Sequence, residues 1–204
     1  MKKIPEKTIE RLSAYRRTLM ELTSGGLTHI YSHQLAEAHS ITAVQVRRDF
    51  MLIGYSSDTK KGYDISMLIR HISGIIDAEV KQKVAVIGMG NLAQAITHYF
   101  NGKRTKLTIV AGFDTDPQKI GQVVAGVKCF DVANFADVAR RTGVTVAILA
   151  IPATAVPGII APLEESGVRG VLNFTSAPLN LHRGVFVENY DIITLLEKVA
   201  YFSK

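Results

Sequence analysis

Cysteine is nearly absent from this chain of 204 residues, since Cys129 is the only one. One cysteine excludes a disulfide framework and a zinc site built from cysteines. The six histidines supply no metal motif either, because they show no His-Glu-x-x-His or similar spacing. We therefore expect no metal centre, and we interpret the histidines as surface or packing residues.

Long apolar runs are missing as well. No stretch approaches the roughly 20 residues that a helix needs to cross a bilayer, and no apolar signal core follows the basic N-terminus. The sequence also has no internal repeats and no low-complexity tracts. These absences predict a soluble, cytoplasmic protein without a membrane partner.

A strong charge imbalance is also lacking. Lys and Arg exceed Asp and Glu by 24 to 18, which gives a net charge of +6, but the excess is spread over the chain. Such a charge is compatible with a polyanionic partner without proving one. Any argument for nucleic-acid binding must therefore depend on where the basic residues lie.

The pattern of apolar residues changes near residue 80, and this change divides the chain. Before it, apolar residues recur at helical spacing; after it, short runs of Val, Ile and Ala alternate with helical stretches. The length is comfortable for two domains. We expect a first domain over residues 1–80, a second over residues 81–189, and a C-terminal helix within residues 190–204.

The middle of the first domain has the pattern of a helix-turn-helix. Ser32 is the expected N-cap of a short helix over residues 33–39, and a Thr-x-x-Gln capping box at residues 42–45 opens the next helix. The apolar residues of that second helix, at i, i+4 and i+7, predict one buried face. We expect Gln45 and Arg48 to point away from this face, with Arg47 flanking them.

A polar hairpin follows this helix. A helix-turn-helix followed by such a basic hairpin makes a winged helix. The hairpin runs from Gly54 to Gly62 and ends with two lysines. Arg and Gln can read guanine and adenine edges in the major groove, and lysines meet phosphates. The candidate DNA-binding residues are Ser32, Gln45, Arg47, Arg48, Lys60 and Lys61. The alternative, an ordinary solvated helix face, stays open at this point.

The second domain repeats a strand-helix rhythm. The predicted strands are nearly all apolar, as in a parallel sheet that helices cover on both faces. They lie at residues 83–88, 107–113, 127–130, 144–150 and 170–174, and the helices at 92–100, 132–141 and 155–166. The fold class is therefore α/β, with a winged-helix domain followed by a Rossmann-like doubly wound parallel sheet.

A Gly-x-Gly-x-x-Ala turn joins the first strand to the first helix of this domain. Gly88 permits the tight turn, Gly90 lets a pyrophosphate approach the backbone, and Ala93 is small enough for close strand-helix packing. The exposed N–H groups and the positive end of the helix suit phosphates. The turn predicts a dinucleotide site.

An acidic residue at the end of the second strand strengthens this prediction. Asp114 is placed to bind ribose hydroxyls and to repel a 2′-phosphate, so it favours NAD(H) over NADP(H). Asp116 is a rival, but we expect it to cap a following helix that has Pro117 at its first position. The alternative is a relative of the fold that binds CoA or no nucleotide.

An enzyme of this fold needs an acid or base near the nicotinamide. The sequence has no Tyr-x-x-x-Lys motif and no paired His and Asp at the strand ends, and residues 151–154 contain no strong acid or base. We therefore predict a protein that is not an enzyme. A small NAD(P)-dependent oxidoreductase, whose N-terminal domain serves dimerisation, remains the alternative from another class.

Several short stretches, in this order, resemble the Rex family of redox-sensing transcriptional repressors. They are Arg11-Leu12-x-x-Tyr15-x-Arg17, Val46-Arg47-Arg48-Asp49-Phe50, Gly88-x-Gly90-Asn91-Leu92, Phe113-Asp114, Lys119-Ile120-Gly121, residues 148–153, residues 170–174 and Asn189-Tyr190-Asp191. The resemblance implies a homodimer that binds operator DNA when NAD+ dominates and is released by NADH. It also implies that a C-terminal helix over residues 191–202 swaps onto the partner subunit, although a helix folded back on its own subunit fits the sequence too.

The resemblance assigns further site residues. Tyr99 corresponds to a tyrosine near the nicotinamide, Asp191 to the aspartate that opens the swapped helix, and Arg17 to an arginine that can pair with it; these three form the expected switch. The expected cofactor-binding residues are Gly88, Met89, Gly90, Asn91, Leu92, Ala93, Tyr99, Asp114, Pro152, Phe174 and Asp191. Because the wing lacks the family's glycine-rich basic sequence, a nucleotide-binding interaction protein that has lost DNA binding is a further alternative.

Overall fold

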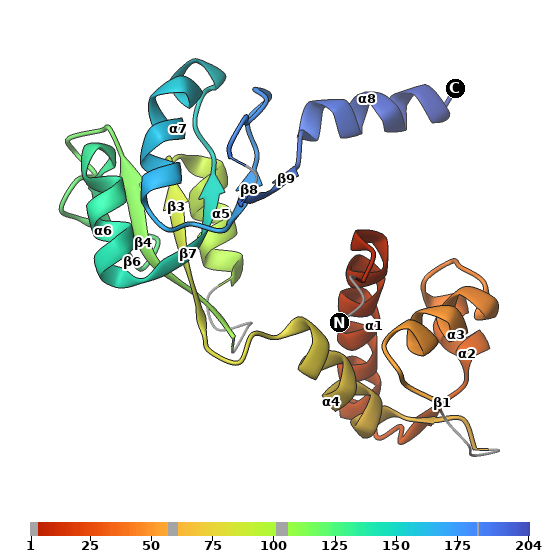
Figure 1. Cartoon of the computed structure of the whole chain (residues 1–204). Helices are drawn as coiled ribbons and strands as arrows, with labels where there is room; N and C mark the ends of the chain where they lie inside the picture. Colours follow the sequence, from red (N-terminus) through yellow and green to blue (C-terminus); the bar gives the residue numbers. More distant parts are fainter. Residues whose placement is uncertain (1–3, 57–60, 101–105, 183) are drawn as a thin grey trace. The chain divides into compact units, whose positions relative to one another are not determined.

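The computed structural model describes residues 4–56, 61–100, 106–182 and 184–204. The chain divides into two compact units, residues 1–79 and 80–204 (Figure 1). Each unit has its own hydrophobic core. No helix in these described ranges is long and apolar enough to span a membrane.

The first unit is a small helical domain with a two-stranded sheet. Its elements are α1 (Glu6–Ser24), β1 (His29–Ile30), α2 (Ser32–Ala38), α3 (Ala43–Leu52), β2 (Tyr63–Asp64) and α4 (Ile65–Ile76). Helix α1 packs on α4, α2 packs on α3, and β1 pairs antiparallel with β2. Strand β2 follows the predicted wing, of which residues 57–60 lie outside the described residues, and the order of the described helices and strands agrees with the predicted winged helix.

The starts of α2 and α3 show where capping was predicted well and where it was not. Thr42 caps α3, because its hydroxyl accepts a hydrogen bond from the N–H of Gln45 (3.2 Å). Ser32 is not the N-cap of α2: the helix begins at Ser32, and Tyr31 is the N-cap. The Gln34 side chain accepts a hydrogen bond from the N–H of Tyr31 (2.8 Å), which allows the helix to begin one residue earlier than predicted.

The second unit is built around a seven-stranded sheet with the order β5-β6-β4-β3-β7-β8-β9. Among the strands that the structure describes in this sheet, β5 pairs antiparallel with β6, and the other neighbouring pairs are parallel. The strands are β3 (Gln82–Ile87), β4 (Leu107–Asp114), β5 (Val123–Val124), β6 (Val127–Asp131), β7 (Val144–Leu149), β8 (Gly170–Asn173) and β9 (Phe186–Asn189). The predicted α/β fold class, with a doubly wound parallel sheet, is therefore confirmed.

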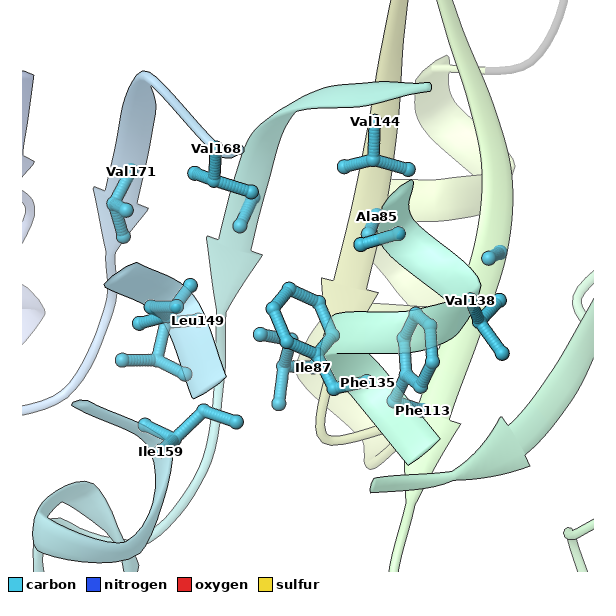
Figure 2. Close-up of a cluster of buried hydrophobic side chains, with 14 residues drawn as sticks. Ala85, Ile87, Phe113, Phe135, Val138, Val144, Leu149, Ile159, Val168 and Val171 are labelled. Carbon is cyan, nitrogen blue, oxygen red and sulfur yellow. The ribbon is translucent and has the colours of Figure 1, made fainter. Parts of the chain in front are cut away.

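Helices cover both faces of this sheet. They are α5 (Asn91–Phe100), α6 (Phe135–Thr142) and α7 (Val156–Glu165), with short 3-10 turns η1 (Val132–Asn134) and η2 (Ala153–Ala155). A further helix, α8 (Ile192–Phe202), follows β9 and buries none of its residues within the described chain. Alternate residues of β3 point to opposite faces. Ala85 and Ile87 pack with α6 and α7, as Figure 2 shows, whereas Val84 and Val86 lie in the cluster that includes Ala93 of α5.

Three local predictions in this unit need correction. Strands β5 and β9 were not predicted, because one has two residues and the other is mostly exposed and so has no buried apolar run. No helix follows Asp116; its carboxylate accepts a hydrogen bond from the N–H of Gln118 (2.9 Å) within a turn. That turn ends at Gly121, whose N–H donates to the carbonyl oxygen of Cys129 (2.9 Å), and the chain passes directly into the β5–β6 hairpin.

Candidate functional site

The predicted phosphate turn lies where the ends of β3, β4 and β7 meet. The N–H of Gly88 donates to the carbonyl oxygen of Phe113 (2.7 Å), and the N–H of Ala150 donates to that of Ile87 (2.9 Å). Gly88 has φ +86°, and a Cβ at this position would collide with the carbonyl oxygen of Ala150 and lie 2.7 Å from Cγ2 of Ile151. Only glycine fits such a position without strain.

The rest of the turn divides into open and buried positions. A Cβ on Gly90 would meet no atom within 4 Å, so the backbone there is open to a ligand. Asn91 begins α5 and is exposed, as is Leu92. Met89 and Ala93 are fully buried in the sheet-helix core. Met89 and Ala93 therefore support the turn by packing in the core beneath it.

A cavity of about 550 Å³ opens at the carboxyl ends of the strands, where this fold class binds its ligands. It brings together four of the predicted residues: Gly88, Gly90, Asp114 and Pro152. Other parts of its wall were not predicted, among them apolar residues from η1 and α7. They include Val132, Ala133, Ile159 and Pro162. These residues belong to no motif and are recognisable only once the chain is folded.

Asp114 is held firmly at one end of this cavity. Its Oδ2 accepts hydrogen bonds from the N–H of Met89 (2.9 Å) and from Nζ of Lys119 (2.9 Å), and its Oδ1 accepts one from the N–H of Asp116 (2.9 Å). Burial alone would raise the pKa of this carboxyl, but the hydrogen bonds, above all that from Lys119, outweigh burial and hold the pKa below its usual range. Asp114 is therefore an anion at neutral pH.

Three other predicted cofactor-binding residues, Tyr99, Phe174 and Asp191, are not part of this cavity's described lining. Tyr99 lies on α5 and is 68% exposed. Phe174 follows β8 and meets the ring of Tyr190 edge-on, with centroids 5.5 Å apart. Asn173, just before it, is buried and donates to Oδ1 of Asn189 (2.9 Å), which fastens the end of β8 to β9.

Asp191 is the N-cap of α8, as the sequence predicts. Its Oδ1 accepts a hydrogen bond from the N–H of Ile193 (3.0 Å), and its Oδ2 accepts one from Oγ1 of Thr194 (2.8 Å). The hydrogen bond from Thr194, with help from the backbone N–H groups, lowers the pKa of this carboxyl. Both carboxylate oxygens therefore take part in starting the helix.

The outward face of α3 carries the predicted DNA-binding arginines. Arg47 and Arg48 are exposed, and so are Val44 and Met51, which share the face at i, i+3, i+4 and i+7. Nη1 of Arg47 donates to Oγ of Ser32 at the start of α2 (3.0 Å). Ser32 and Arg47 are thus brought together, and the hydrogen bond orients a cation at the edge of the helix-turn-helix.

Gln45 faces a different environment from the one predicted. It is half-buried, and its Nε2 donates to Oδ1 of Asp49 (3.0 Å). Asp49 is fully buried and also accepts from Nε (2.6 Å) and Nη2 (2.7 Å) of Arg11 and from the hydroxyl of Tyr15 (2.9 Å). The prediction that Gln45 points freely outward is therefore wrong, because a buried carboxylate of its own helix binds its amide.

The remaining predicted basic residues lie in the first unit. Lys61 and Arg17 are exposed, whereas Lys60 lies outside the described residues. Arg17 is on α1, in a different unit from Asp191, so its pairing with that aspartate stays a prediction.

Comparisons with known proteins agree along the whole chain. Residues 3–50 match a family model described as a putative DNA-binding protein N-terminus, and residues 79–177 match one described as a CoA binding domain. The chain is 34% identical to the redox-sensing transcriptional repressor Rex of Listeria welshimeri over 200 residues, which cover 98% of this chain and 93% of the relative. It is also 34% identical to that of Anoxybacillus flavithermus, over 99% of this chain and 95% of the relative.

Solved structures give the same result in three dimensions. A Rex-family repressor, RSP, in complex with β-NAD+ and operator DNA has a TM-score of 0.90, with 27% identity, and covers 99% of this chain and 93% of its own. The same repressor in complex with β-NADH has a TM-score of 0.85, with 27% identity, and covers 99% of this chain and 95% of its own.

Proposed function

Because this chain belongs to the Rex family of redox-sensing transcriptional repressors, we propose that it represses transcription by binding operator DNA and that NADH releases it. The observation that carries the proposal is the full-length match, in sequence and in fold, to a repressor whose structures hold NAD+ with operator DNA, or NADH. The glycine turn and the arginine face of α3 are the two sites that such a protein requires.

The nucleotide is NAD(H), and its proposed position follows from the cavity. The N–H groups of the turn from Gly88 to Ala93, at the positive end of α5, suit the pyrophosphate. Asp114 accepts hydrogen bonds from ribose hydroxyls at one end. Pro152 lies in the cavity wall beyond β7, and the nicotinamide would extend from there toward Phe174, Tyr99 and Asp191.

Operator DNA would meet the exposed face of α3. Arg48 is exposed and free to reach base edges, while Arg47, oriented by Ser32, is placed for a base or a phosphate. Lys61 supports phosphate contact from the wing. Gln45 is bound by Asp49, so its contribution to base recognition is smaller than the arginines'.

This proposal describes a sensor and not an enzyme. The relatives are named repressors, and the charged side chains in the cavity, Asp114 and Lys119, are paired with each other at one end. NADH mixed with the protein and a simple aldehyde should therefore keep its absorbance at 340 nm. A repressor acts where chromosomal DNA and the nicotinamide pool meet, which makes the cytoplasm the expected compartment.

Helix α8 is proposed as the dimer contact. None of its residues is buried within the described chain. Its apolar residues form a broad stripe, as expected of a helix that packs on a partner: Ile192, Leu195, Leu196, Val199 and Phe202. A second copy of this chain would cover the stripe by exchanging the helix.

A charge on this stripe should break the dimer. We expect the parent chain to sediment at about twice its mass of 22.3 kDa, and Leu196→Glu to sediment as a monomer at micromolar concentration, because a buried carboxylate without a partner is costly. Lys198→Glu, on the same helix, is the control and should stay dimeric. A monomeric parent, or a Leu196→Glu chain as dimeric as the control, would contradict the proposal.

The test of the function is an anisotropy titration. A labelled palindromic Rex-type operator is bound by the protein in saturating NAD+ at fixed salt, and NADH is then added. We expect the anisotropy to fall to that of free DNA as the NADH fraction rises. DNA binding that does not change with NADH would contradict the proposal that NADH is the effector. Absence of DNA binding would overturn the repressor proposal.

Two variants probe the switch in the same titration. Tyr99→Phe and Asp191→Asn should flatten the response to NADH while leaving DNA affinity in NAD+ largely intact, because NAD+ and NADH differ only at the nicotinamide. Asn is chosen because it still caps a helix, whereas Ala would cost the cap about 1 kcal/mol. Variants that respond like the parent would show that the switch lies elsewhere.

A further inference from the structure

The ribose end of the cavity carries a cation that the nucleotide motif does not explain. Lys119 lines the cavity beside Asp114 and Thr115. Its Nζ lies 2.9 Å from Oδ2 of Asp114 and 3.7 Å from Oδ2 of Asp116. From the sequence, Asp114 is expected to be a single negative charge at this end, but the structure shows an ammonium between two carboxylates.

This ammonium changes the electrostatics that a ribose would meet. An unpaired carboxylate repels a 2′-phosphate, whereas a carboxylate with an ammonium at 2.9 Å is largely neutralised at the distance of a bound ligand. An ammonium has three N–H donors. One is used by Asp114, and Asp116 is beyond normal hydrogen-bond length, so donors remain for a ribose or phosphate oxygen.

We propose that Lys119 is a specificity-determining residue, whose ammonium sets how strongly the site discriminates between NADH and its 2′-phosphorylated form, NADPH. The inference rests on the proposed NADH binding and extends it to the phosphate that distinguishes the two dinucleotides. With Lys119 in place, Asp114 still accepts the ribose hydroxyls, but its repulsion of a phosphate is weakened. Without Lys119, the described residues of this corner are two carboxylates, Asp114 and Asp116, and the described cavity lining contains no other cation.

The ratio of dissociation constants, Kd for NADPH over Kd for NADH, isolates this effect. The two ligands differ only by the phosphate, so damage to the turn or to the cavity changes both constants and cancels in the ratio. The fluorescence of the reduced nicotinamide, excited at a wavelength where no amino-acid side chain absorbs, measures both dissociation constants. Isothermal titration calorimetry provides the second measurement.

Three lysine variants of the full chain make the test. We expect Lys119→Met to raise the ratio on the order of tenfold, because the phosphate then faces uncompensated carboxylates. Lys119→Arg keeps the charge and should leave the ratio within about threefold of the parent. Lys128→Met is the matched control: it removes one exposed cation from β6, outside the cavity lining, and should leave the ratio unchanged.

Each outcome has a distinct meaning. A raised ratio in Lys119→Met alone supports the proposal. A Lys119→Met chain that binds NADH but has the parent's ratio overturns it, as does one that loses both ligands by the same factor, since Lys119 would then have only a structural role. A parent chain that binds neither dinucleotide would instead overturn the proposed function, and this inference with it.

Discussion

Replacing Asp49 by Asn is expected to lower the free energy of unfolding of the N-terminal unit by about 3 kcal/mol, the cost of breaking a buried ion pair. Asp49 is fully buried and accepts two hydrogen bonds from Arg11, one from Tyr15 and one from Gln45. The asparagine side chain would point its NH2 group at one of the groups that now donate to Asp49. It would also leave the Arg11 guanidinium without its counter-charge. Hydrogen exchange of the α1 and α3 amides in the full chain measures the loss.

The loss should depend on pH in a definite direction. Burial by itself would raise the pKa of Asp49, but the hydrogen bonds from Arg11, Tyr15 and Gln45 outweigh it and lower the pKa in the folded chain. A carboxyl with a lowered folded pKa stabilises the fold above its unfolded pKa, about 3.9, and loses that contribution as pH falls through the folded value. The difference between parent and variant should therefore be constant at neutral pH and shrink in acid.

An exposed ion pair on α1, the helix that carries Arg11, provides the control. Lys7 and Glu10 of α1 are paired at 3.1 Å, with side chains 80% and 55% exposed. Glu10→Gln should cost less than about 1 kcal/mol, since solvent screens such pairs. If Asp49→Asn cost no more than Glu10→Gln, the buried network would not hold α3 on α1, and the arginine face of α3 would need another support.

The same network shows what the sequence could and could not predict in the first unit. Local patterns were sufficient to predict helix α3. The i, i+4, i+7 apolar spacing predicted its buried face, and Thr42 predicted where it begins. The burial of Asp49 was not predictable, because it depends on Arg11, which lies 38 residues earlier in the chain. The half-buried position of Gln45 was not predicted for the same reason, since its hydrogen-bond partner Asp49 is buried only in the folded unit.

The second unit repeats this contrast at the candidate site. The strand, glycine turn and helix from residue 82 to 100 are contiguous, and they were predicted from adjacent residues. The apolar walls from η1 and α7, and the ammonium of Lys119, reach the cavity only because parallel pairing brings the ends of β3, β4 and β7 to one edge. Strand β9, mostly exposed, left no periodic signal at all.

Within the turn, the two glycines should fail in different ways. Gly88→Ala is expected to destabilise the second unit by about 3 kcal/mol, because the residue has φ +86° and its Cβ would press the end of β3 away from Ala150. Since the turn is then displaced, NADH affinity should fall roughly a hundredfold, the binding equivalent of that strain. Urea unfolding and NADH titration of the same preparations measure both effects.

Gly90→Ala is the matched variant that separates folding from binding. Its added methyl group meets no atom within 4 Å, so stability should stay within about 0.5 kcal/mol of the parent. The methyl group lies, however, where the pyrophosphate must approach the backbone, and we expect NADH affinity to fall about tenfold, or 1.4 kcal/mol. Equal losses of stability in both variants would contradict the assignment of Gly88 to the strand junction, and undiminished NADH binding by Gly90→Ala would contradict the assignment of the turn to the pyrophosphate.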